Sequence, residues 1–110
     1  MPVEGFWTAE FGSSVGIFGG GVAFLRNGKI LGGDNAYFYV GDYKLAELAF
    51  TATLEVNPFI QGIASVFNTV DQKFTLDLVG SVEGQDRIVA QGQRRGMPGV
   101  TFGVKLTKRA

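Results

Sequence analysis

The side chains of this chain that could do chemistry are carboxylates, hydroxyls and amines, because the sequence contains no histidine and no cysteine. Histidine is the commonest general base at neutral pH, and both missing residue types are common ligands of transition metals. Ser13, Ser14 and Ser65 therefore have no imidazole to activate them. Asp34 and Asp42 flank one expected strand and would stand at its opposite ends, a spacing typical of turns. We predict a protein without enzymatic activity, catalytic residues, metal or cofactor.

Residues 16–34 contain seven glycines and invite comparison with phosphate-binding loops. A Walker A loop requires the pattern G-x-x-x-x-G-K-[ST]. With Gly28-Lys29 as its G-K pair, the first glycine would fall on Ala23 and the hydroxyl residue on Ile30, so both positions fail. The dinucleotide pattern G-x-G-x-x-G has no register here either. Glycines inside a strand mark bends, bulges or close backbone approach, and we expect that role for them.

Alternation of apolar and polar residues dominates the chain and indicates half-buried antiparallel strands. Short turn signals separate the alternating segments, and Asn27-Gly28 is typical of a two-residue type I′ hairpin turn. Further turn signals are Gly33-Asp34-Asn35 and Gly41-Asp42. Strands are expected near residues 4–12, 16–26, 29–33, 35–41, 45–56, 72–83, 86–95 and 100–108.

Closing these strands into a barrel would bury the apolar face and remove both exposed sheet edges. A chain of 110 residues is long enough for one domain. We therefore predict a single all-β domain over residues 1–110, an eight-stranded antiparallel up-and-down β-barrel. Residues 57–72 break the alternation: Asn57-Pro58 suits a turn or a helix start, whereas Gly62 limits any helix to two turns. A short helix or an ordered loop is expected near residues 58–67.

The inward parity of the expected strands predicts which side chains fill the barrel or bind a ligand inside it. These are Trp7, Phe50, Leu54, Phe74, Leu76, Phe102 and Val104. Small residues share the same parity and could leave a void: Ala9, Gly20, Ala52, Ala90 and Gly92. An eight-stranded barrel can hold one small ligand or be filled completely, and the pattern is the same in both cases.

The tyrosines and the charges bear on possible partners. Tyr37, Tyr39 and Tyr43 share one parity, so they could form a binding stripe on an exposed sheet face or pack against neighbouring strands. Ten acidic and ten basic residues balance, which argues against direct nucleic-acid binding. Five of the basic residues lie in residues 94–110. They could form a basic patch that binds an acidic partner, or they could pair with the acidic residues of the first strand.

The sequence contains no recognisable signal for secretion or membrane insertion. The first residues lack a basic segment followed by a long apolar one, and no uncharged apolar run reaches about 18 residues. We expect a cytoplasmic protein that does not enter a membrane.

Two stretches of sequence resemble known families. Gly5-Phe6-Trp7 resembles the G-x-W motif that opens the first strand of lipocalins, where the tryptophan packs across the closed end of the barrel. The segments EGFWTAEF, GGGVAFLRNGKILGGDNAYFYVG and SVFNTVDQKFTL together resemble the GrlR-like family, negative regulators of type III secretion with a lipocalin-like, calycin-type barrel. The motif residues are Asn27, Gly28, Gly32, Gly33, Asp34, Ala36, Tyr39 and Gly41.

This resemblance implies a small cytoplasmic bacterial regulator that dimerises and binds another protein, in the type case a transcriptional activator. The acidic loop associated with partner binding in that family falls on residues 42–48, where only Asp42 and Glu47 are acidic. The expected partner-binding residues are therefore Tyr37, Tyr39, Asp42, Tyr43 and Glu47. The alternative function is a carrier or sensor of a small apolar ligand inside the barrel.

Overall fold

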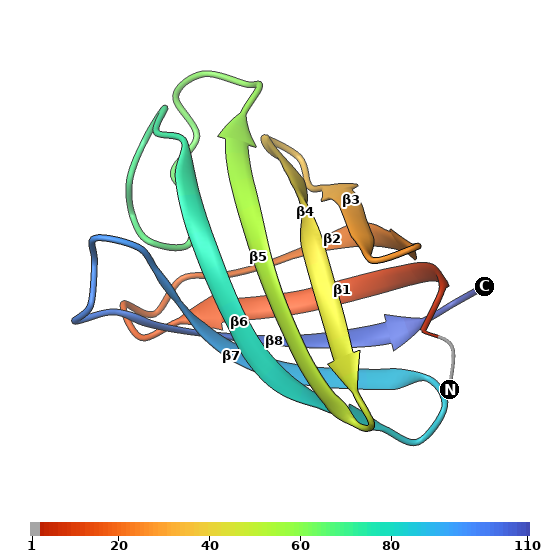
Figure 1. Cartoon of the computed structure of the whole chain (residues 1–110). Helices are drawn as coiled ribbons and strands as arrows, with labels where there is room; N and C mark the ends of the chain where they lie inside the picture. The colour runs from red at the N-terminus through yellow and green to blue at the C-terminus, as the bar shows by residue number, and fades with distance from the viewer. Residues whose placement is uncertain (1–2) are drawn as a thin grey trace.

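The computed structural model describes residues 3–110, which form a closed antiparallel barrel of eight strands. The strands are β1 (Gly5–Ser13), β2 (Phe18–Arg26), β3 (Lys29–Gly33), β4 (Tyr37–Ala46), β5 (Ala49–Pro58), β6 (Phe74–Glu83), β7 (Arg87–Arg94) and β8 (Thr101–Lys108). Each strand pairs with the next, and β1 pairs with β8 to close the barrel. In Figure 1, β4, β5 and β6 lie steeply in the view and cross β1, β2 and β8, which lie closer to horizontal. The predicted all-β up-and-down barrel is confirmed.

The first hairpin turns where the sequence predicts it. Asn27 and Gly28 have φ values of 52° and 77°, the positive values that a type I′ turn requires at both central positions. The turn also contacts the next hairpin, because the Tyr43 N–H donates to the Gly28 carbonyl oxygen at 2.9 Å. The Asn27-Gly28 turn therefore sets the register of β2 against β3, in which Arg26 lies opposite Lys29.

The β4–β5 hairpin is longer than predicted, and the turn expected at Gly41-Asp42 is wrong. Both residues lie inside β4, and Gly41 is opposite Leu54 of β5. A Cβ on Gly41 would stand 2.0 Å from the Thr53 carbonyl oxygen, so this glycine serves close strand approach. The chain turns instead at Glu47, whose φ is 58°.

The segment 59–73 is an ordered loop, so the helical alternative for residues 58–67 is wrong. Asn57 and Pro58 continue β5 and pair with Phe38 and Tyr37. Contacts within the loop hold it together: the Ser65 N–H donates to the Thr69 carbonyl at 2.8 Å. Across residues 3–110, the structure contains no helix long and apolar enough to cross a membrane.

The core fills the barrel with the residues that the alternation points inward. All seven predicted interior side chains are buried, and Trp7 and Phe50 are 0% exposed. Trp7 packs at the end of the barrel near the chain termini, where its Nε1–H donates to the Val3 carbonyl oxygen at 2.8 Å. Burying such large side chains is the main source of stability in a domain of this size.

Candidate functional site

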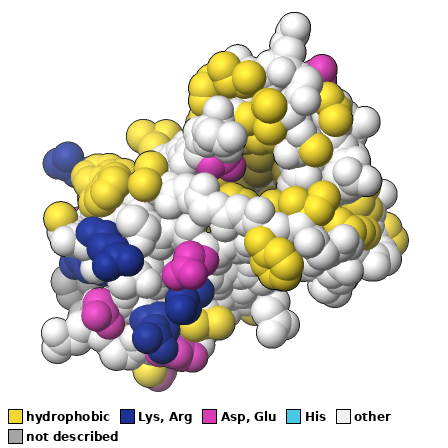
Figure 2. Space-filling view, turned by 180° about the vertical axis from the view of Figure 1, so that it is seen from behind, with side chains coloured by type: hydrophobic (Ala, Val, Ile, Leu, Met, Phe, Trp, Pro, Cys, Tyr) yellow, Lys and Arg dark blue, Asp and Glu magenta, His cyan; other side chains and the backbone are white. Residues whose placement is uncertain are grey.

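The barrel interior contains a cavity of about 160 Å³. Six of the seven predicted ligand-binding residues line it: Phe50, Leu54, Phe74, Leu76, Phe102 and Val104. Trp7 does not line it, because it packs toward Val3 instead. Among the small inward residues, Ala9 and Gly20 line the cavity, whereas Ala52, Ala90 and Gly92 do not. Seen from behind in Figure 2, the molecule is hollowed, with hydrophobic side chains visible inside the hollow.

Polar side chains also line the cavity, among them Asp34 and Tyr39. One carboxylate oxygen of Asp34, Oδ1, accepts the N–H groups of Ala36 and Tyr37, each at 2.9 Å. The other oxygen, Oδ2, accepts the Tyr39 hydroxyl. Burial raises the pKa of Tyr39 well above its usual value, and the hydrogen bond to Asp34 and its negative charge add to this effect. Asp34 and Tyr39 thus form a hydrogen-bonded polar group in a wall that is mostly apolar.

The raised pKa of Tyr39 predicts a loss of stability at alkaline pH. A folded pKa above the unfolded value of about 10 contributes stability below pH 10 that is lost as the pH rises further. We expect the free energy of unfolding to fall more steeply above pH 10 in the wild type than in Tyr39→Phe. Urea unfolding measured at several pH values between about 8 and 11 checks this. The same dependence of the free energy of unfolding on pH in both proteins would contradict the attribution of this loss to Tyr39.

The tyrosines do not form the exposed stripe that was one interpretation of their parity. Tyr37 is buried and its hydroxyl donates to the Ile63 carbonyl oxygen at 2.7 Å. Tyr43 packs against Phe50 with ring centroids 5.9 Å apart. With Tyr39 bound to Asp34, all three pack on the core, because polar partners or aromatic rings are available there.

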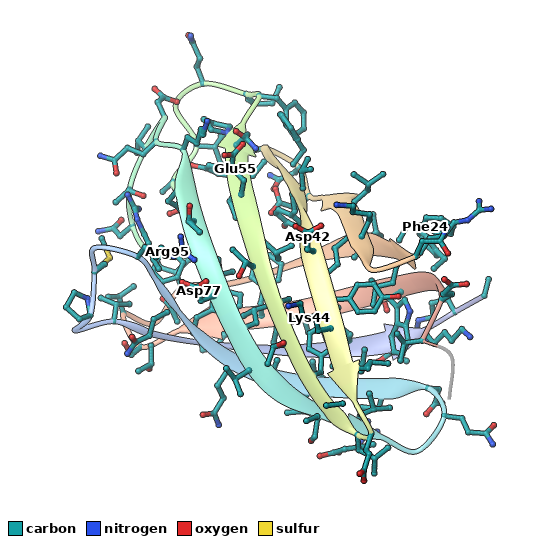
Figure 3. The ribbon with its side chains drawn as sticks, viewed as in Figure 1. Phe24, Asp42, Lys44, Glu55, Asp77 and Arg95 are labelled. Atoms are coloured by element: carbon teal, nitrogen blue, oxygen red, sulfur yellow. The ribbon has the colours of Figure 1, made fainter. Side chains whose placement is uncertain are left out.

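The outward side chains of β4 instead belong to an apolar surface that runs across β1 to β4 and includes one residue of the loop after β5. We call it the apolar outer face; its residues are Phe6, Val22, Phe24, Leu31, Phe38, Val40 and Phe59, each 39% to 54% exposed. Strand pairing makes it continuous. Phe6 lies opposite Phe24, Phe24 opposite Leu31, and Leu31 opposite Val40. Phe38 contacts Phe59 with ring centroids 6.5 Å apart. Figure 3 shows Phe24 projecting away from the barrel.

The acidic residues of the predicted partner site lie near this face. Asp42 points outward from β4 and forms an ion pair of 2.6 Å with Lys29, which is opposite it on β3. This pair adjoins the Leu31 and Val40 pair, so it borders the apolar outer face. Glu47 is exposed at the β4–β5 turn, at the far end of the strand from Tyr37. The structure therefore places Asp42 and Glu47 outside and the three tyrosines inside.

The basic residues near the C-terminus are divided among several partners. Lys105 lies opposite Glu10 and 3.8 Å from its carboxylate, which matches the expected pairing with the first strand. Arg95 donates to both oxygens of Asp77, and these bonds hold the pKa of Asp77 below its usual value. Figure 3 shows Arg95 and Asp77 side by side. These pairs are exposed and contribute little to stability.

Sequence reasoning missed the apolar outer face, although a signal for it exists. In VAFL at residues 22–25 and YFYV at residues 37–40, apolar or aromatic residues occupy both parities. Loss of alternation in a strand whose other face is already buried indicates a second apolar surface. Comparison with known proteins finds no family model and no curated protein that matches the chain. The resemblance to the GrlR-like family stays a prediction, and the closed barrel is compatible with the lipocalin-like fold that it implies.

Proposed function

We propose that this chain is a non-enzymatic, cytoplasmic bacterial regulator that acts by protein–protein contact, as its resemblance to the GrlR-like family implies. We propose further that it works as a homodimer in which the apolar outer faces of two copies cover each other. The observation that carries the proposal is the apolar outer face, a continuous surface on a closed barrel. Large exposed apolar patches on soluble proteins mark surfaces that other molecules cover.

The size of the face suits a stable dimer. At about 200 Å² per large side chain, the exposed fractions leave roughly 600 Å² of apolar surface in water. A standard interface buries about 800 Å² on each partner, with an apolar centre and a polar rim. The apolar outer face supplies the centre of such an interface, and bordering polar residues such as Lys29 and Asp42 supply part of the rim.

The charges favour a second copy as the occupant. The chain has a formal net charge of zero, so two copies do not repel each other at long range. The bordering pair Lys29 and Asp42 presents both signs together. A border with both signs can meet itself across a twofold axis without like charges facing each other. A nucleic acid or an anionic membrane would require a cluster of basic residues at this surface.

Sedimentation equilibrium with matched variants tests the dimer. Val40 in the apolar outer face and Val79 on β6 are both outward valines, 44% and 66% exposed. We expect the wild type and Val79→Lys to dimerise alike. Val40→Lys and Leu31→Lys would each bury two unpaired charges, one per copy, and weaken the dimer by at least roughly a hundredfold. A wild type that stays monomeric, or equal weakening by Val40→Lys and Val79→Lys, would contradict the proposal.

The regulatory role is tested in the host bacterium by transcript profiling. Deletion of the gene is expected to raise the expression of a defined set of genes. Complementation with the wild type or Val79→Lys should restore the original profile, whereas Leu31→Lys should not. An unchanged profile after deletion contradicts regulation, and full restoration by a monomeric Leu31→Lys protein contradicts the dimer as the working form.

A further inference from the structure

We infer that the interior cavity is a binding site for a small neutral ring compound that carries one hydrogen-bond donor. The apolar ring would lie inside the barrel, and its donor would meet the carboxylate of Asp34. This site is separate from the apolar outer face, which lies on the outside of β1 to β4. The inference therefore does not depend on the dimer.

The volume limits the ligand to about one ring. The cavity measures about 160 Å³, and an apolar protein cavity of about 150 Å³ is known to hold benzene. Sites for drug-sized ligands begin at roughly 300 Å³, so this cavity encloses only about one ring of a larger molecule such as a steroid. A single six-membered ring with one small substituent does fit.

The walls of the cavity favour an aromatic ring. Phe67 contacts Phe74 edge to face at a centroid distance of 5.3 Å and Phe102 in a stacked arrangement at 5.8 Å. All three line the cavity together with aliphatic side chains such as Leu54. Rings held in fixed orientations offer both faces and edges to another ring, which adds to the attraction from apolar burial.

The polar group in the wall selects for a donor. A carboxylate can accept about four hydrogen bonds, and Asp34 accepts three, from two backbone N–H groups and from Tyr39. One lone pair on Oδ2 is therefore available to a ligand. Three other polar residues line the cavity: the Tyr37 hydroxyl donates to Ile63, the Ser65 hydroxyl shares a hydrogen bond with Thr69, and Asn35 is exposed. A ligand acceptor placed near Asp34 would be repelled by the carboxylate.

Phenol and toluene are suitable probes, because they have nearly the same shape and only phenol has a donor. Titrations of ¹⁵N-labelled protein followed by amide chemical shifts are expected to show both probes perturbing cavity residues such as Leu54 and Phe74. Asp34→Asn keeps an acceptor for the two backbone N–H groups and removes the negative charge. It should weaken phenol by about tenfold, as loss of a charged hydrogen-bond acceptor does, and leave toluene within about twofold.

Two further variants keep the test decisive even if Asp34→Asn folds poorly. Tyr39→Phe removes the competing hydroxyl from Oδ2, so phenol should bind more tightly while toluene changes little. Ala23→Leu fills part of the cavity and should weaken both probes. Thermal unfolding confirms that each variant is folded. Failure of phenol to bind the wild type overturns the site, and equal effects of Asp34→Asn and Tyr39→Phe on phenol and toluene overturn the role of Asp34.

Discussion

Replacing Trp7 with alanine is expected to lower the free energy of unfolding by about 3 to 5 kcal/mol. Trp7 is completely buried, and it closes the end of the barrel near the chain termini together with Val3. The substitution removes the largest side chain of the core, leaves a cavity and deprives the Val3 carbonyl oxygen of its donor. For a domain whose total stability is about 5 to 15 kcal/mol, this loss brings the protein close to unfolding.

Urea unfolding followed by circular dichroism measures this loss, since Trp7 is the single tryptophan and its fluorescence disappears with it. Trp7→Phe is the control, because it keeps most of the apolar volume and loses the hydrogen bond to Val3. We expect it to cost about 1 to 2 kcal/mol. Equal losses for Trp7→Ala and Trp7→Phe would show that the hydrogen bond, and not packing, dominates at this end of the barrel.

The strands and their order could be predicted because most strands have one buried face and one solvent-exposed face, which produces alternation of apolar and polar residues. In β5, Phe50, Ala52, Leu54 and Val56 all point inward, as the alternation requires. The β4–β5 turn could not be predicted, since Glu47 adopts a positive φ that few non-glycine residues adopt. The pairing of β4 with β5 along their full lengths places the turn at this position. The local sequence contains no residue typical of a turn that would predict it.

The candidate sites were harder to predict than the fold. Parity placed six side chains in the cavity wall, but the size of a cavity depends on how side chains of adjacent strands pack, which alternation does not encode. In β4 both parities are aromatic or apolar between Tyr37 and Val40, so the pattern could not say which face is inside. In the structure the tyrosines face inward, where the Tyr37 and Tyr39 hydroxyls donate hydrogen bonds to acceptors.

Replacing Gly80 with alanine is the second substitution with a large expected effect. A Cβ at this position in β6 would stand 2.0 Å from the Val89 carbonyl oxygen and 2.5 Å from the Cα of Ala90. Both contacts are with backbone of β7, so no side-chain rotation can relieve them. The strands must separate locally and weaken their hydrogen bonds, because the strongly coiled sheet of a small barrel brings them close here. We expect a loss of about 3 kcal/mol.

Gly103→Ala is the matched control for Gly80→Ala. Gly103 also lies inside a strand, β8, but a Cβ there would meet nothing within 4 Å. Because alanine loses less backbone entropy on folding than glycine, we expect Gly103→Ala to change stability by less than about 0.5 kcal/mol or to raise it slightly. The free energy of unfolding of both variants, measured in urea, separates two explanations for a glycine inside a strand. Similar losses of stability at both positions would mean that these strands tolerate no added side chain in general. A loss confined to Gly80→Ala would mean that glycine is required there because β6 and β7 approach closely.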